Sequence, residues 1–104
     1  MSDVADITLE EIIAKLREIA PAIRAEGVTR LAIFGSRARG DASPDSDLDV
    51  LIDIDPAARF SLLNLSGVGL MVQDATGLKT QVTLRRSLNE RMAQRIADDL
   101  IEVF

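Results

Sequence analysis

Aliphatic side chains occupy every even position from Leu48 to Ile54, whereas aspartates occupy positions 47, 49, 53 and 55. A period of two is typical of a β-strand, because successive side chains of a strand point to opposite faces. The segment is therefore predicted to be a strand with one aliphatic face and one acidic face. Asp47 and Asp49 share the acidic face, and their spacing places them about 6.5–7 Å apart along the strand.

An apolar run from Val28 to Phe34 predicts a second, buried strand that ends at Gly35. A short helix is expected through residues 37–39, and a loop over residues 41–45 then leads to the acidic strand. Glycine lets the backbone come close to a ligand, and the free N–H groups at the start of a helix favour an anion. This turn between a strand and a helix is therefore a candidate anion-binding site.

Three side chains of the turn suit a phosphate group in particular. The Ser36 hydroxyl can donate a hydrogen bond to a phosphate oxygen, and Arg37 and Arg39 supply positive charge nearby. The turn lacks the Gly-Lys-Ser/Thr ending of a Walker loop, so it does not belong to that class of nucleotide site.

A capping box predicts a helix at the start of the chain. Thr8 and Glu11 have the Thr-x-x-Glu spacing that opens a helix, and apolar residues follow it at helical intervals. Pro21 cannot donate an interior helix hydrogen bond, so a kink or break is expected near Ala20, and Gly27 is expected to end the helical segment.

The second half of the chain predicts two more helices and one more strand. Residues 61–75 are apolar on nearly all sides of a helix, and residues 79–84 alternate as a third strand. Ser87 and Glu90 form another capping box, which predicts a last helix to about Val103. Its inward-facing positions are expected to be Leu88, Met92, Ile96, Leu100 and Val103.

These segments predict the α+β class, with a small mixed sheet of about three strands flanked by helices. One domain is expected over residues 1–104, with residues 1–7 as a flexible arm. The apolar helix over residues 61–75 has two interpretations. It can fill the core, or it can face a partner, including a second copy of the chain in a homodimer.

Composition excludes several classes of function. The 104 residues carry a formal net charge of −5, which argues against an extended nucleic-acid-binding surface. The chain has no Cys and no His, and so offers neither a thiolate nor an imidazole for catalysis or metal binding. The acidic first residues do not resemble a signal peptide, and no apolar run approaches the roughly 20 residues of a membrane span. A cytoplasmic location is therefore expected.

The two aspartates have the chemistry of a magnesium site. Carboxylates at this separation can share one Mg²⁺ or bridge two, with phosphate oxygens completing the coordination. A structural interpretation is also open, because an acidic strand can keep a protein soluble and discourage edge pairing. The glycine turn that precedes Asp47 and Asp49 favours the metal site over this alternative.

The combination of a strand, Gly35-Ser36, Arg39-Gly40 and then Ser46-Asp47-x-Asp49 resembles the signature of the polymerase-beta-like nucleotidyltransferase superfamily. Residues 8–104 resemble the smallest branch of that superfamily, the minimal nucleotidyltransferases, in length and in the order of helices and strands.

The resemblance implies a function and a set of site residues. Gly35 and Ser36 would grip the triphosphate of ATP, and Asp47 and Asp49 would be catalytic carboxylates that hold Mg²⁺. Other nucleotide-binding positions would be Arg37, Arg39 and Ser46. Many members of this branch are antitoxins that bind a HEPN-domain ribonuclease and can modify it with AMP, so such a ribonuclease is the expected partner.

One position departs from the pattern of the family. The third carboxylate of the family is expected on the polar face of residues 79–84, where the best-aligned residue is Gln81. A glutamine can ligate weakly through its carbonyl oxygen, but it cannot act as a base. Asp53 shares the acidic face, but it lies roughly 13 Å from Asp49 along the strand and cannot replace the missing acid.

Three functions are compatible with these observations. The chain can be an enzyme that transfers AMP from Mg·ATP to a protein or a small acceptor. It can be an antitoxin that neutralises its partner by contact alone, which the substitution at Gln81 and the apolar helix favour. A plain acidic structural domain is the third alternative, although it leaves the paired motif to coincidence.

Overall fold

The computed structural model describes residues 7–104, so the predicted arm, apart from Ile7, lies outside the described residues. Ile7 itself packs against the hydrophobic core. No helix of the described part of the chain combines the length and the apolar character that crossing a membrane requires.

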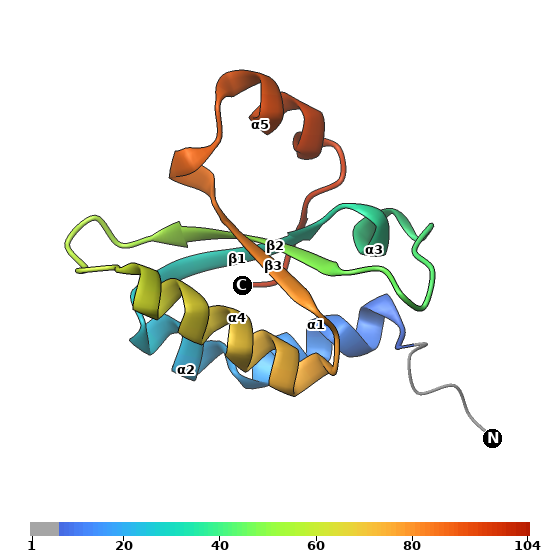
Figure 1. The fold of residues 1–104 in the computed structure, drawn as a ribbon, viewed down its shortest axis with the longest axis horizontal. Helices are drawn as coiled ribbons and strands as arrows, with labels where there is room; N and C mark the ends of the chain where they lie inside the picture. The colour runs from blue at the N-terminus through green and yellow to red at the C-terminus, as the bar shows by residue number, and fades with distance from the viewer. Residues whose placement is uncertain (1–6) are drawn as a thin grey trace.

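A four-stranded mixed sheet forms the centre of the molecule, with the strand order β3-β2-β1-β4 (Figure 1). Strand β1 (Val28–Phe34) pairs antiparallel with β2 (Leu48–Ile54) and with β4 (Ile101–Glu102), whereas β2 and β3 (Thr80–Leu84) are parallel. The predicted α+β class with a small mixed sheet is confirmed, and the sheet has one strand more than expected.

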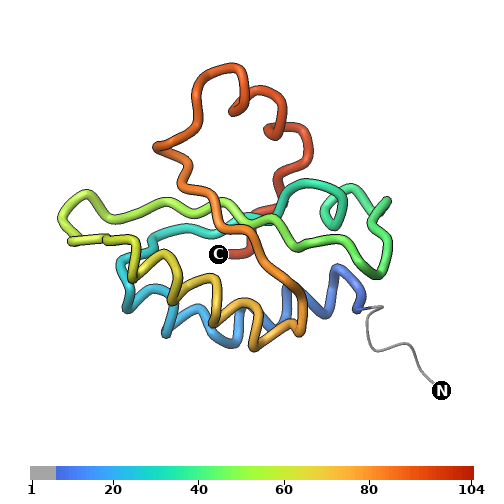
Figure 2. The backbone as a smooth tube through the Cα atoms, in the orientation of Figure 1, coloured from blue at the N-terminus to red at the C-terminus, as the bar shows by residue number. Residues whose placement is uncertain are grey.

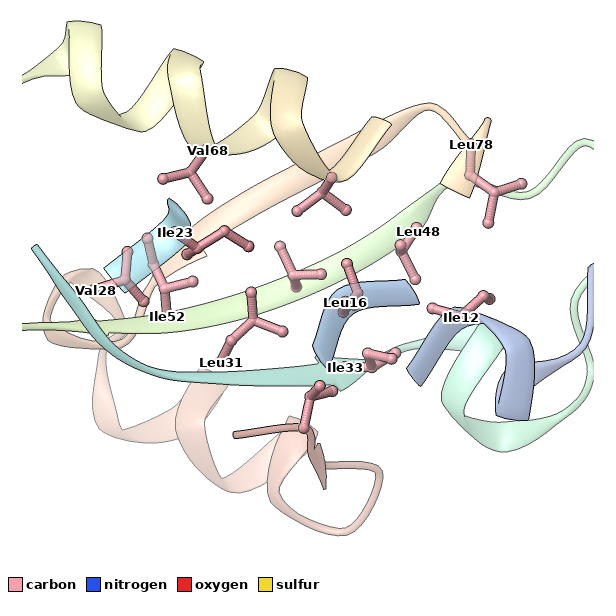
Figure 3. Close-up of a cluster of buried hydrophobic side chains, with 13 residues drawn as sticks. Ile12, Leu16, Ile23, Val28, Leu31, Ile33, Leu48, Ile52, Val68 and Leu78 are labelled. Atoms are coloured by element: carbon pink, nitrogen blue, oxygen red, sulfur yellow. The ribbon is translucent and has the colours of Figure 1, made fainter. Parts of the chain in front are cut away.

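Three helices cover one face of this sheet: α1 (Leu9–Glu18), α2 (Ala20–Ala25) and α4 (Leu62–Thr76) (Figure 1). Aliphatic residues at alternate positions of β1 and β2 meet the apolar sides of the helices, and their side chains are almost fully buried (Figure 3). The residues that form the largest part of this core are Ile12, Leu16, Ile23, Leu31, Ile33, Leu48, Val50, Ile52, Val68 and Val72.

Local signals determine the ends of α1 and α2 as predicted. The Thr8 hydroxyl accepts from the backbone N–H of Glu11, and the Glu11 carboxylate accepts from the backbone N–H of Thr8, which completes the capping box. The helix ends at Glu18, and α2 begins at Ala20 with Pro21 in its first turn, where a proline ring is tolerated. The expected break near Ala20 is therefore confirmed.

Helix α4 buries only part of its apolar surface. Val68 and Val72 are buried against the sheet, whereas Leu62 and Leu63 are 81% and 84% exposed and Leu70 is 60% exposed. Ser61 caps the helix in a reciprocal arrangement with Asn64. The helix therefore fills the core with one side and presents leucines to solvent at its N-terminal end.

The predicted last helix is present, but its predicted start and its extent to Val103 are wrong. Residues Arg85–Ser87 form a single 3₁₀ turn (η1), helix α5 covers only Glu90–Ala97, and Ile101–Glu102 are strand β4. The helix begins at Asn89, whose side chain accepts from the backbone N–H of Met92. Residues 101–104 are not helical, because Ile101 and Glu102 pair with β1, and Val103 and Phe104 exchange backbone hydrogen bonds with Leu31.

Helix α5 lies on the opposite side of the sheet from α1, α2 and α4 (Figure 1). The chain runs from β3, at one edge of the sheet, through α5 and back to β4 at the other edge (Figure 2). None of its residues is buried, and Met92, expected to face inward, is 47% exposed. Because Leu48, Val50 and Ile52 of β2 pack against α1, α2 and α4, the alternate, acidic face of β2 lies on the α5 side of the sheet.

Candidate functional site

The turn at Gly35 and the acidic face of β2 come into direct contact. Gly35 has φ 79° and ψ −157°, a conformation that is essentially restricted to glycine. A Cβ atom built on Gly35 would collide with the carboxylate of Asp49, because Asp49 pairs with Phe34 in the β1–β2 register. Glycine is required here for two reasons, and the two halves of the sequence motif form one site.

The two aspartates of the motif lie close enough to influence each other. Asp47 directly precedes β2, Asp49 is its second residue, and both are partly exposed. Burial raises the pKa of Asp49 above its ordinary value, the negative charge of Asp47 raises it further, and Arg39 opposes the shift. The site therefore concentrates negative charge that the nearby protein groups do not fully balance.

This donor set fits a divalent cation such as Mg²⁺. Carboxylate oxygens are hard donors, and a divalent cation would relieve the repulsion that raises the pKa of Asp49. Among residues 7–104, however, no group of three or more Asp, Glu, His or Cys side chains is arranged to hold a metal. A cation at this position would therefore need further oxygen atoms from a ligand or from water.

Gln81 lies where the sequence places the missing third carboxylate. It is the register partner of Asp49 in the parallel pair of β2 and β3, so the two side chains point to the same face of the sheet. Gln81 is exposed. The site therefore has two acids on β2 and a neutral amide on the neighbouring strand.

Asp53, the other acid on this face, belongs to a separate group of charges. Its carboxylate accepts from Arg85 Nε at 2.7 Å and lies 3.8 Å from Arg30 Nε. Arg30 also forms an ion pair with Glu102 on β4. These partners compensate the charge of Asp53, which takes no part in the candidate site, as its distance along the strand predicts.

Arg37 holds the loop that leads to the acidic strand. Its guanidinium is buried, with 7% of the residue exposed, and donates to the carbonyl oxygens of Ser46 (2.9 Å) and Pro44 (3.2 Å). The predicted contact between Arg37 and phosphate would require these hydrogen bonds to break. The Ser46 hydroxyl accepts from the backbone N–H of Ser43, so it also stabilises this loop.

Ser36 and Arg39 remain beside the turn, where the sequence predicts phosphate contacts. Ser36 is the first residue of α3 (Ser36–Arg39), and the first N–H groups of a helix have no partner within the helix. The exposed Arg39 donates to Asp41 and to Asp99, each at 3.0 Å. Arg39 thus connects the turn to the residues that follow α5.

A cavity of about 290 Å³ adjoins the turn, between the end of β1 and helix α5. We call it the α5 pocket, and its lining residues are Phe34, Gly35, Arg39, Met92, Arg95, Ile96 and Asp99. The four residues from 92 to 99 were not predicted as site residues. The spacing of Met92 and Ile96 indicated an apolar helix face, but it could not show that this face borders a cavity.

Known proteins resemble this chain in sequence and in fold. Residues 9–103 match the family described as Nucleotidyltransferase domain. The chain is 31% identical over 101 residues to the protein adenylyltransferase MntA of Thermococcus cleftensis, an alignment that covers 96% of this chain and 100% of the relative.

Two solved structures share the fold. One is described as a minimal nucleotidyltransferase; it has a TM-score of 0.78 and 27% identity, and the alignment covers 92% of this chain and 96% of the other. The second is a chain from the structure of a tri-AMPylated HEPN toxin of Shewanella oneidensis in complex with an MNT antitoxin. It has a TM-score of 0.63 and 13% identity over 89% of this chain and 71% of the other. The chain therefore belongs to the nucleotidyltransferase domain family, as a member of its minimal branch.

Proposed function

We propose that the chain binds Mg·ATP between the Gly35 turn and the Asp47–Asp49 pair and transfers AMP to a hydroxyl group of a protein. The contact between Gly35 and Asp49 is the observation that carries this proposal, because it joins an anion-binding turn to a carboxylate pair in a single site. The relative named protein adenylyltransferase supports adenylate as the group transferred.

Different residues of the site would bind the metal ion and the phosphate groups. Asp47 and Asp49 would hold Mg²⁺, which when bound would offset the charge of the phosphate oxygens. Ser36 and the N–H groups at the start of α3 bind phosphate oxygens, and Arg39 adds positive charge. Arg37 is a positioning residue, because it fixes the loop that carries Asp47.

The transfer forms one bond and breaks another. The oxygen of the acceptor hydroxyl forms a bond to the α-phosphorus of ATP, the bond from that phosphorus to the bridging oxygen breaks, and pyrophosphate leaves. The hydroxyl proton must be taken up during this exchange. Gln81 can accept a hydrogen bond but cannot take the proton, so solvent or a group of the acceptor receives it. Transfer by the wild-type chain is therefore slow.

Substitution of Gln81 by aspartate tests this assignment. A carboxylate beside Asp49 can accept the proton, and general-base catalysis typically contributes at least about 100-fold to a rate. We expect Gln81→Asp to raise the rate of transfer from α-labelled ATP to a HEPN-type ribonuclease by at least about tenfold, and Asp47→Ala to abolish transfer.

Thr83→Asp is the matched control for this substitution. Thr83 is two residues further along the same face of β3, opposite Leu51 instead of Asp49, so its carboxylate would lie outside the site. Fast wild-type transfer that Gln81→Asp leaves unchanged would contradict the role given to position 81. Transfer that survives Asp47→Ala would contradict the site as a whole.

A second function, neutralisation of the partner by contact, is favoured by Gln81 and by the exposed leucines of α4. Under this proposal the partner is again a HEPN-type ribonuclease, the class of toxin that is bound to an MNT antitoxin in the structurally similar complex. Inhibition of the ribonuclease by the Asp47→Ala variant without nucleotide would show that contact suffices, whereas inhibition that requires ATP and Asp47 would show that modification is needed.

A further inference from the structure

The α5 pocket has two kinds of wall. Gly35 and Arg39, which border it on one side, are residues that we assign to phosphate binding. Phe34, Met92 and Ile96 give it an apolar surface, and Arg95 and Asp99 lie at the polar part of its border. A ligand whose phosphates bind at the Gly35 turn can therefore place its remaining atoms in the adjoining pocket.

Within residues 7–104, the apolar side of α5 is not covered completely by other parts of the protein. Met92 and Ile96 are one helical turn apart and so share a face, yet Met92 is 47% exposed and no residue of α5 is buried. The other exposed positions of this helix are mainly polar or charged. An apolar helix face that borders an open cavity is typical of a small-molecule site, and 290 Å³ lies just below the usual range of about 300–1,000 Å³.

The strand order separates this pocket from the position of the acceptor. The acids lie on β2, Gln81 lies on β3, and the pocket lies beyond the end of β1 on the opposite side of the acids. Gln81 is exposed and lies beside Asp49, so we place the acceptor hydroxyl on this open side of the acids. The pocket is therefore available to the nucleoside part of the nucleotide, which carries no phosphate.

We propose that the α5 pocket binds the nucleoside part of the nucleotide, with Met92 and Ile96 in contact with the base. This inference rests on the proposed function, because it requires the triphosphate at the Gly35 turn. This contact is mainly apolar, because it is made by the side chains of Met92 and Ile96. It adds to the affinity for the nucleotide that the phosphate contacts provide.

The test compares two ligands in the presence of Mg²⁺ by calorimetry: α,β-methylene-ATP, which cannot undergo the transfer, and inorganic tripolyphosphate, which has no nucleoside. We expect Met92→Ala to weaken binding of α,β-methylene-ATP about five- to tenfold, from the loss of part of one apolar side-chain contact. Binding of tripolyphosphate should remain within about twofold of the wild type, because its contacts lie outside the pocket.

Two further variants complete the test. Ile96→Ala should have the same selective effect as Met92→Ala. Gln94→Ala, an exposed position on α5 that does not line the pocket, should leave both ligands unaffected, which controls for changes in the helix itself. Alanine is the best helix former, and circular dichroism of each variant verifies that α5 and the sheet are retained.

The outcomes separate this inference from the proposed function. If Met92→Ala and Ile96→Ala leave both ligands unchanged, or weaken both equally, the pocket does not hold the nucleoside although the phosphate site stands. If tripolyphosphate binds the wild type as tightly as α,β-methylene-ATP does, the nucleoside makes no contact and the inference fails in the same way. If neither ligand binds the wild-type protein in a magnesium-dependent manner, the proposed function fails and the inference fails with it.

Discussion

At the scale of single residues, the environment of Asp49 shows how a binding site lowers the stability of its own fold. Burial and the neighbouring Asp47 raise the pKa of Asp49, and the folded protein therefore holds this proton to a higher pH than the unfolded chain does. At neutral pH the ionised carboxylate destabilises the fold. This cost disappears as the pH falls through the folded-state pKa towards the ordinary value of an aspartate.

Asp49→Asn should therefore raise the Tm of the protein at pH 7, measured without metal or nucleotide. The gap in Tm between the variant and the wild type should shrink as the pH falls from 7 towards 4, because wild-type Asp49 then becomes neutral as well. Asp53→Asn is the matched control, since Asp53 lies on the same face but pairs with Arg85, and its loss should lower Tm. A decrease in Tm on Asp49→Asn would contradict this account of the site.

At the scale of elements, the loop between α3 and β2 depends on one buried arginine. The side chain of Arg37 extends from the short helix α3 and donates three hydrogen bonds to the carbonyl oxygens of Pro44 and Ser46, next to Asp47. A guanidinium is suited to this task because its donors point in several fixed directions at once. The position of Asp47 in the site is thus determined by a residue that does not itself face the site.

Arg37→Ala should lower the free energy of unfolding by about 1.5–3 kcal/mol, the usual contribution of hydrogen bonds that involve a charged group. It should also weaken magnesium-dependent binding of ATP, because the loop that carries Asp47 loses its support. Chemical denaturation and calorimetry measure the two effects. Arg86→Ala, at an exposed arginine, should change the stability by no more than about 0.5 kcal/mol. Equal effects of the two variants would show that Arg37 does not support the loop.

Elements defined by short-range signals could be predicted from the sequence, whereas those defined by long-range pairing could not. The period of two in β2 and the capping box at Thr8 act within a few residues, and the structure follows them. Strand β4 has two residues, and only its pairing with β1 distinguishes it from a helix end. For the same reason the α5 pocket could not be foreseen: α5 borders Gly35 only because β4 brings the chain back to β1.

At the scale of the whole molecule, the distribution of apolar surface leads to a prediction about where the proposed partner would bind. One side of the sheet is closed by three helices, yet the N-terminal end of α4 exposes Leu62 and Leu63 almost completely. Helix α4, which carries these leucines, lies on the opposite side of the sheet from α5 and the candidate nucleotide site (Figure 1). Contact with a partner through α4 would therefore leave the nucleotide site accessible.

The double variant Leu62→Asp/Leu63→Asp should weaken binding to a HEPN-type ribonuclease at least tenfold and leave binding of ATP unchanged. Buried apolar side chains dominate such contacts, and a charge in place of each leucine would oppose burial. Ala14→Asp introduces a single negative charge at an exposed position of α1 and should have no effect. Surface plasmon resonance measures the affinity. Undiminished binding by the double variant would show that the partner binds elsewhere. If sedimentation shows that the wild type is a dimer and the double variant a monomer, the leucines instead contact a second copy of the chain.

The path of the chain through α5 limits how far this helix can move. Its segment leaves the sheet from β3 at one edge and rejoins it through β4 at the opposite edge, so neither end is free. The few connecting residues on each side set an upper limit to its distance from the sheet. A folded domain therefore cannot pass between α5 and the sheet. Under the proposed function, a protein that receives AMP would therefore present its hydroxyl group from the exposed Gln81 side and not from beneath α5.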